Sequence, residues 1–138
     1  MGDDVRRLPV DGDPPVRFTN TALAMAERLT GRTVPQLAAQ LAVGQFSIDM
    51  VNRIAVAGLE GARLKQRTGG KEWKLRDVEE LIEAAVDGGA SFEDVATPLI
   101  DAFADAMRKW FPEEEEPADP PTAAGIGTGS SEPPSEPG

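Results

Sequence analysis

The chain has 138 residues and a formal net charge of −10 at pH 7, and it contains neither cysteine nor histidine. The lack of both residue types excludes disulfide frameworks, thiolate sites and most nucleophilic or zinc-dependent mechanisms. The length suits one domain with a modest core, and we expect neither a membrane span nor a secretory signal.

The acidic charge is concentrated at one end of the sequence. Residues 112–138 hold seven of the 24 acidic residues and none of the 14 basic ones, which leaves a charge of −3 for residues 1–111. Seven prolines and Gly/Ser repetition in the same segment are typical of chains that bury too little apolar surface to fold. We predict a disordered acidic tail over residues 112–138.

Residues 1–15 are polar and proline-rich, with a turn signal at Asp11-Gly12. We interpret them as a flexible N-terminal segment, or as a weak β-hairpin that pairs residues 5–10 with residues 16–18. The prolines would confine such a hairpin to an edge. The domain itself is predicted over residues 16–111, as an all-α bundle of about five helices.

The clearest local signal is a strand-like stretch that runs into a helix. Thr19 and Asn20 are residues that cap helix N-termini, and they precede a helical pattern over residues 20–30 that stops at Gly31. Four apolar residues recur on one face of that pattern: Phe18, Ala22, Ala26 and Leu29. We expect Phe18 to be buried where strand and helix meet.

Two further helices have marked ends. Thr33-Val34-Pro35-Gln36 is a capping box, and Gly44 offers a left-handed exit from the second helix. The third helix is predicted to begin at Ser47. Gly58 and Gly61 lie in its second half, where each costs about 1 kcal/mol relative to alanine. We interpret a stripe of small residues there as a contact face, with a kink as the alternative; the stripe comprises Ala55, Gly58, Gly61 and Ala62.

Residues 63–76 are predicted to form a basic loop, with six cationic side chains and the single acid Glu72 around Trp73. Three interpretations stay open: a solvated loop, a surface for a partner protein or for this chain's own acidic run 113–116, and a nucleic-acid site. The last is disfavoured, because only one aromatic residue is interleaved with the cations.

The fourth helix is predicted over residues 75–86. Its outward acids Glu79, Glu80 and Glu83 fit a solvated face better than a metal site. The fifth helix starts at Ser91. Pro98 either kinks it or begins a second helix.

The apolar pattern of the fifth helix ends at Trp110-Phe111. We interpret these aromatic residues as closing the core, with a docking motif as the alternative.

No arrangement of residues for catalysis is found. A Ser/His/Asp triad is impossible without histidine, and Gly69-Gly70-Lys71 lacks the rest of a phosphate-binding loop. We therefore expect a non-enzymatic protein that needs neither a cofactor nor a metal.

The segment Arg17-Phe18-Thr19-Asn20-x-Ala22-Leu23 resembles the tail assembly chaperones of long-tailed bacteriophages and gene transfer agents. Those proteins share a short strand that ends in such a step, followed by a helix with a late glutamate, here Glu27. The segment 29–34, the later helices and the acid-rich run 77–82 follow the same order. The resemblance covers roughly residues 16–110.

The resemblance implies a small helical chaperone of the host bacterial cytoplasm that is absent from the mature virion. It would bind the tape measure protein, keep its apolar stretches soluble and help recruit tail tube subunits, with self-association possible. As candidate partner-binding residues we select Ala55, Gly58, Gly61, Ala62, Trp73 and Trp110. The alternatives are a structural virion component, such as a neck or tail-completion protein, and a host regulatory module that binds nucleic acid.

Overall fold

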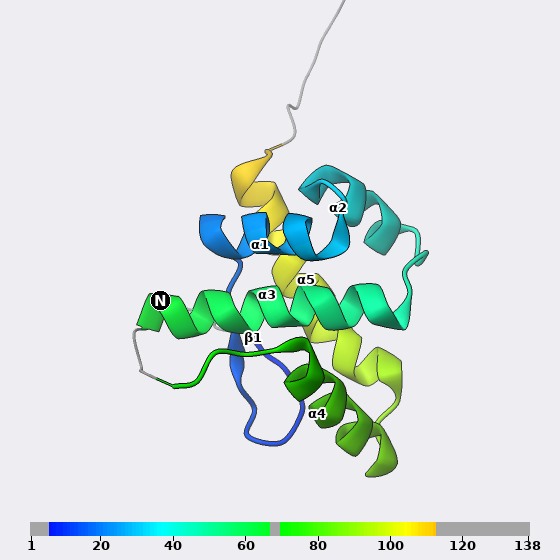
Figure 1. Ribbon diagram of the computed structural model, residues 1–138. Helices are drawn as coiled ribbons and strands as arrows, with labels where there is room; N and C mark the ends of the chain where they lie inside the picture. Colours follow the sequence, from blue (N-terminus) through cyan, green and yellow to red (C-terminus); the bar gives the residue numbers. More distant parts are fainter. Residues whose placement is uncertain (1–5, 67–69, 113–138) are drawn as a thin grey trace, which may run out of the picture. The chain divides into compact units, whose positions relative to one another are not determined.

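A computed structural model describes residues 6–66 and 70–112, and the chain divides into two compact units, residues 1–107 and 108–138. The described residues form five helices and a short antiparallel hairpin, so the predicted fold class is confirmed (Figure 1). In chain order the elements are β1 Arg6–Arg7, β2 Pro15–Val16, α1 Asn20–Thr30, α2 Val34–Ala42, α3 Ile48–Gln66, α4 Leu75–Asp87 and α5 Phe92–Trp110.

The unit boundary falls before the predicted end of the domain at residue 111, because the last turn of α5 belongs to the second unit. Nearly all of the predicted acidic tail, residues 113–138, lies outside the described residues.

The predicted helix ends are confirmed in α1 and α2. The hydroxyl of Thr19 accepts a hydrogen bond from the Ala22 N–H at 3.2 Å, and Gly31 ends α1 with a φ of +74°. Thr33 and Gln36 form the reciprocal capping box of α2. Local sequence therefore defines these ends, since each cap uses residues within four positions of it.

The fifth helix is continuous through Pro98, so the alternative of two separate helices is wrong. Ser91 and Asp94 cap its start reciprocally, each side chain accepting from the other residue's N–H at 3.0 Å. A proline in its second turn removes one N–H donor but leaves the helix intact.

In the first unit, α3 is covered on several sides. α1 and α4 lie on opposite sides of it and α5 passes behind (Figure 1). Every residue from Ile54 to Ala62 is buried, which is more than the one apolar face that the sequence predicts. A helix buried all round needs other segments of the chain to enclose it.

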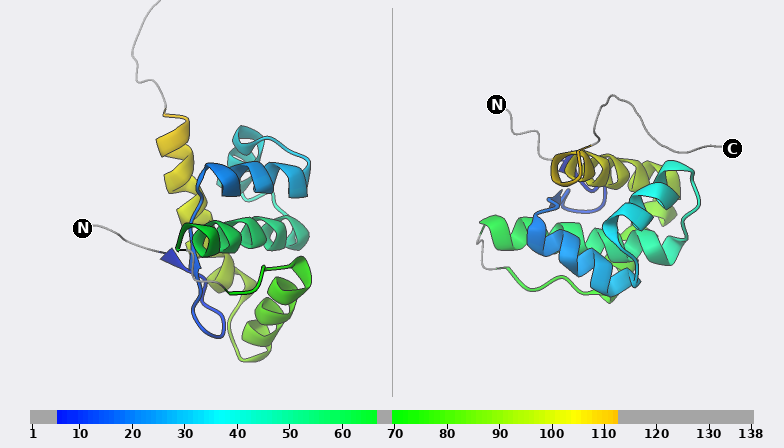
Figure 2. Two further views of the ribbon diagram at one scale, coloured as in Figure 1. Left: turned by 60° about the vertical axis from the view of Figure 1, so that its left-hand side comes forward. Right: turned by 90° about the horizontal axis from the view of Figure 1, so that it is seen from above.

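The hairpin supplies part of that enclosure. β1 and β2 pair Arg6 with Val16, and the view from above in Figure 2 shows them between α3 and α5. Leu8 is fully buried and Val10 is 7 % exposed, both within the core cluster. Of the two interpretations of residues 1–15, the hairpin is therefore confirmed, and the structure describes it from residue 6 onward. The ladder is shorter than predicted because Pro9 and the prolines at 14 and 15 lack N–H donors.

The small residues of α3 allow the backbone after β2 to approach closely. The N–H of Arg17 donates to the Gly58 carbonyl at 2.9 Å. A Cβ atom at position 58 would lie 2.8 Å from the Phe18 ring, and one at position 61 would overlap the Arg17 carbonyl oxygen. The contact-face interpretation of Gly58 and Gly61 is confirmed, but the face contacts this chain's own N-terminal segment.

Phe18 is 7 % exposed and packs edge-to-face on Phe103 of α5, with ring centroids 5.2 Å apart and planes at 88°. Its predicted burial is confirmed. The ring thus contacts α3 on one side and α5 on the other.

We expect Phe18→Ala to lower the free energy of unfolding by about 3–5 kcal/mol, because it removes a buried ring that two helices enclose. Urea denaturation followed by circular dichroism measures the change. The control is Phe111→Ala, which removes an exposed ring and should change stability by less than about 0.5 kcal/mol. A loss below about 1 kcal/mol for Phe18→Ala would contradict the burial of this ring between α3 and α5.

Gly61→Ala should also destabilise the domain, although alanine raises helix propensity by about 1 kcal/mol. The added methyl group overlaps a backbone carbonyl that cannot rotate away, so we expect a net loss of about 1–3 kcal/mol in the same denaturation experiment. Gly88→Ala is the matched control, since its nearest contact is an ordinary 3.4 Å. Stabilisation by Gly61→Ala would contradict the close approach.

Candidate functional site

A buried carboxylate marks the end of α3 that approaches the connection to α4. Glu60 is 3 % exposed in the middle of an otherwise apolar stretch. The guanidinium of Arg63, one turn later, donates two hydrogen bonds to it, each of 2.8 Å. The pair is bidentate, which fixes the orientation of both side chains.

The same pair anchors the connection between the two helices. The N–H of Trp73 donates to Glu60 Oε2 at 2.7 Å, and Arg63 Nη1 donates to the Gly70 carbonyl at 3.2 Å. On the other side of the tryptophan, the Lys74 N–H donates to Asp77 at 3.0 Å and caps α4. Trp73 is therefore held from both sides, although it lies outside any helix.

The electrostatics of Glu60 follow from these contacts. The hydrogen bonds from Arg63 hold the pKa of the Glu60 carboxyl below its usual value; burial opposes this and the Trp73 N–H adds to it. The pKa of Arg63 is raised by the same contact. A buried ion pair is on average no more stabilising than apolar packing. We therefore interpret Glu60 as the residue that positions the connection.

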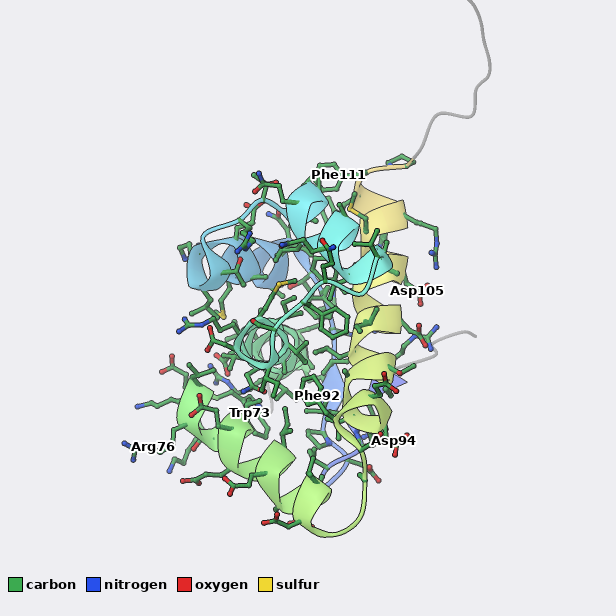
Figure 3. The ribbon with its side chains drawn as sticks, turned by 90° about the vertical axis from the view of Figure 1, so that its right-hand side faces the viewer. Trp73, Arg76, Phe92, Asp94, Asp105 and Phe111 are labelled. Atoms are coloured by element: carbon green, nitrogen blue, oxygen red, sulfur yellow. The ribbon has the colours of Figure 1, made fainter. Side chains whose placement is uncertain are left out.

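Trp73 lies between α3 and α4 and is partly buried against the core, whereas Arg76 points away from the protein (Figure 3). Trp73 lines two hollows, and Lys71 also lines both. The smaller, of about 260 Å³, is formed with the hairpin turn and α3 by Pro14, Pro15, Leu59, Ala62, Arg63, Gln66 and Gly70. The larger, of about 500 Å³, is formed with the start of α4 by Glu72, Asp77, Glu80 and Leu81.

A third hollow, of about 520 Å³, lies where α1, α2 and α3 meet. Its lining is mainly polar and includes Arg32, Arg53 and Gln40. The Gln40 side-chain oxygen is buried without a hydrogen-bond partner. Arg53 is already engaged by Asp49 at 2.7 Å and by the Leu29 carbonyl.

The larger hollow at Trp73 and this third one differ in what they offer. The lining of the third is mainly polar, whereas the surface around Trp73 combines an aromatic residue, aliphatic side chains and a charged rim. Such a mixture is typical of docking surfaces, where tryptophan is enriched among the residues that dominate affinity. We take Trp73 and its two hollows, called the Trp73 site below, as the candidate functional site.

The four small residues selected on α3 do not form a free surface. Ala55, Gly58, Gly61 and Ala62 are buried, and the two glycines contact the segment that carries Arg17. Their interpretation as a partner-binding surface is wrong, because the face that they form is already occupied. Only Ala62 reaches the edge of a hollow at the Trp73 site.

Trp110 and Phe111 are each 46 % exposed, and their interpretation as core closure stays a prediction. Both belong to the second unit, and as a docking motif they stay a prediction. Of the residues selected from the sequence, the structure brings together Ala62 and Trp73.

The basic loop is shorter than predicted, because α3 continues to Gln66 and α4 begins at Leu75. Residues 67–69 of that loop lie outside the described residues. The outward acids Glu79, Glu80 and Glu83 are exposed, as predicted. In the described part of the chain, no three acidic side chains converge to hold a metal ion, and no helix combines the length and apolar character needed to cross a membrane.

Sequence reasoning missed Glu60 and the proline pair of the smaller hollow. The available signal was an acid inside an apolar helical pattern with an arginine three positions later, a spacing at which side chains meet. Comparisons of the chain with protein families, with curated proteins and with solved structures find no match.

We expect Glu60→Gln to lower the free energy of unfolding by about 1.5–3 kcal/mol at pH 7, because the amide keeps only one of the two acceptor oxygens and leaves the charged guanidinium of Arg63 without a counter-charge. The pKa of Glu60 is lower in the folded state than in the unfolded one. The carboxylate therefore stabilises fully above its ordinary pKa of about 4.3, and the effect is lost as the pH falls through the folded value.

The difference between the parent and Glu60→Gln should stay constant from pH 7 to about 5 and shrink below that. Urea denaturation at each pH measures it. Glu79→Gln, which neutralises an exposed carboxylate of α4, is the control and should leave stability nearly unchanged. A difference that grew on acidification would contradict the assigned role.

Proposed function

We propose that the chain is a non-enzymatic tail assembly chaperone of a long-tailed bacteriophage or gene transfer agent. It binds the tape measure protein in the host cytoplasm, keeps its apolar stretches soluble and helps recruit tail tube subunits. It is released before the mature virion is complete.

The observation that carries this proposal is the segment from Arg17 to Leu23. It directly follows the short strand β2, which ends at Val16, and contains the threonine cap and the start of the first helix in the order that the family pattern has. The order of the remaining helices agrees with the resemblance. The lack of histidine and cysteine in the sequence adds to the argument, because it removes the usual catalytic side chains.

The Trp73 site supplies a physical means of binding. An amphipathic helix of a partner can lay its apolar face against a groove with aromatic and aliphatic walls. Trp73 and Leu81 line the larger hollow and provide such walls, since both are partly exposed. Since the backbone around Trp73 is fixed by Glu60 and Asp77, little ordering entropy remains to be lost on binding.

We expect co-expression with the tape measure protein, encoded by a very long coiled-coil gene in the same gene neighbourhood, to increase that protein's soluble fraction. Trp73→Ala should weaken the complex by about 2 kcal/mol, or roughly 30-fold, because it removes the central aromatic wall. Quantitative pull-down from the soluble fraction measures the effect. Circular dichroism checks that the variant is folded.

Trp110→Ala is the comparison, since it removes the other tryptophan. If it weakens the complex more than Trp73→Ala does, the docking surface lies in the second unit. If co-expression leaves the tape measure protein insoluble, the proposed function fails. Recovery of the chain in purified particles would favour a structural virion component instead.

A further inference from the structure

The larger hollow at the Trp73 site has a marked charge pattern. Three carboxylates line it, those of Glu72, Asp77 and Glu80, against the single ammonium group of Lys71. Trp73, partly buried against the core, lines the same hollow. This arrangement contrasts with the predicted basic loop, because the side toward α4 is acidic.

The carboxylates differ in how far they are already engaged. Asp77 accepts the N–H of Lys74 and is committed to capping α4. Within the described residues, Glu72 and Glu80 take part in no hydrogen bond and no ion pair within 4.0 Å. The charge of Glu72 also acts on Arg63, but the carboxylates of Glu72 and Glu80 can both still accept hydrogen bonds from a ligand beside Trp73.

This combination suits a cation. The face of an indole ring attracts an ammonium or guanidinium group, and nearby carboxylates add charge-assisted hydrogen bonds. An anion such as a phosphate group would meet three negative charges there. The hollow is thus poorly suited to nucleic acid, in agreement with the disfavoured interpretation from the sequence.

We propose that this hollow binds a lysine or arginine side chain carried by an amphipathic helix of the partner protein. The aliphatic stem of that side chain lies along Trp73 and Leu81, and its charged end lies between Glu72 and Glu80. The inference rests on the proposed docking site and adds the chemistry of its occupant. It predicts that the partner segment is basic as well as apolar.

The test uses three synthetic helical peptides of about 20 residues, long enough to form helix in water. They consist of leucine, alanine and glutamine and differ at one central position of the apolar face, which is lysine, glutamine or glutamate. The protein is the full chain with Trp110→Phe, so that Trp73 is its only tryptophan. Fluorescence titration of Trp73 at low salt gives the affinities.

The lysine peptide should bind about tenfold more tightly than the glutamine peptide, and the glutamate peptide more weakly than both. The Glu72→Gln/Glu80→Gln double variant should bring the lysine-to-glutamine ratio close to one. The matched control, Glu79→Gln/Glu83→Gln, makes the same change in net charge on exposed acids outside the hollow and should keep the tenfold ratio.

Equal binding of the three peptides, no binding of any, or an equal loss in the control double variant would overturn the proposal. Self-association that Glu72→Gln/Glu80→Gln abolishes, measured by analytical ultracentrifugation, would assign the hollow to a second copy of this chain instead. Co-expression separates the two proposals. If the Glu72→Gln/Glu80→Gln variant leaves the peptide selectivity unchanged while co-expression with the parent chain still keeps the tape measure protein soluble, the cation inference fails and the proposed function stands.

Discussion

The close contact between the backbone at Arg17 and the small residues of α3 is the constraint on which the rest of the first unit depends. Gly58 accepts a hydrogen bond from the Arg17 N–H, and a side chain at Gly61 would overlap the Arg17 carbonyl. Because the strand lies directly on the helix, Phe18 reaches over α3 to Phe103 of α5. The hairpin, the central helix and the last helix are thereby joined through one ring.

The same helix organises the candidate site. Glu60 lies between these two glycines in the sequence, and its carboxylate accepts the N–H of Trp73. The apolar part of α3 thus fixes the fold, and its one buried acid fixes the position of an aromatic side chain in a connecting segment. A charged pair in a small core contributes less through its own energy than through the geometry that it imposes.

Much of the fold could be predicted because its signals are local. The cap at Thr19, the capping box at Thr33 and the cap at Ser91 each use residues within one turn. The partner of the small-residue face could not be predicted, since periodicity shows that a face is buried but not what covers it. The burial of Leu8 was not predicted for a related reason, because a possible hairpin over residues 5–10 does not show what covers it.

The candidate site was predictable only in part. Trp73 was selected from the sequence as an aromatic residue among cations, but its position depends on Glu60, thirteen positions earlier. The larger hollow is acidic because α4 begins two residues after Trp73 and brings Glu80 to the same surface. Such a juxtaposition is a tertiary property, which neither composition nor spacing reveals.

The contact between the hairpin and α5 has a consequence for biosynthesis. Arg6 donates to the Asp105 carboxylate at 2.9 Å across a separation of 99 positions, and its guanidinium lies 3.9 Å from the Asp101 carboxylate. Contacts of such long range raise the contact order above that of a simple helical bundle and slow folding. On the ribosome, the hairpin emerges first and its covering helix last. In the nascent chain, α5 therefore cannot cover the hairpin and the adjoining side of α3 until synthesis has passed residue 105. The core closes only then.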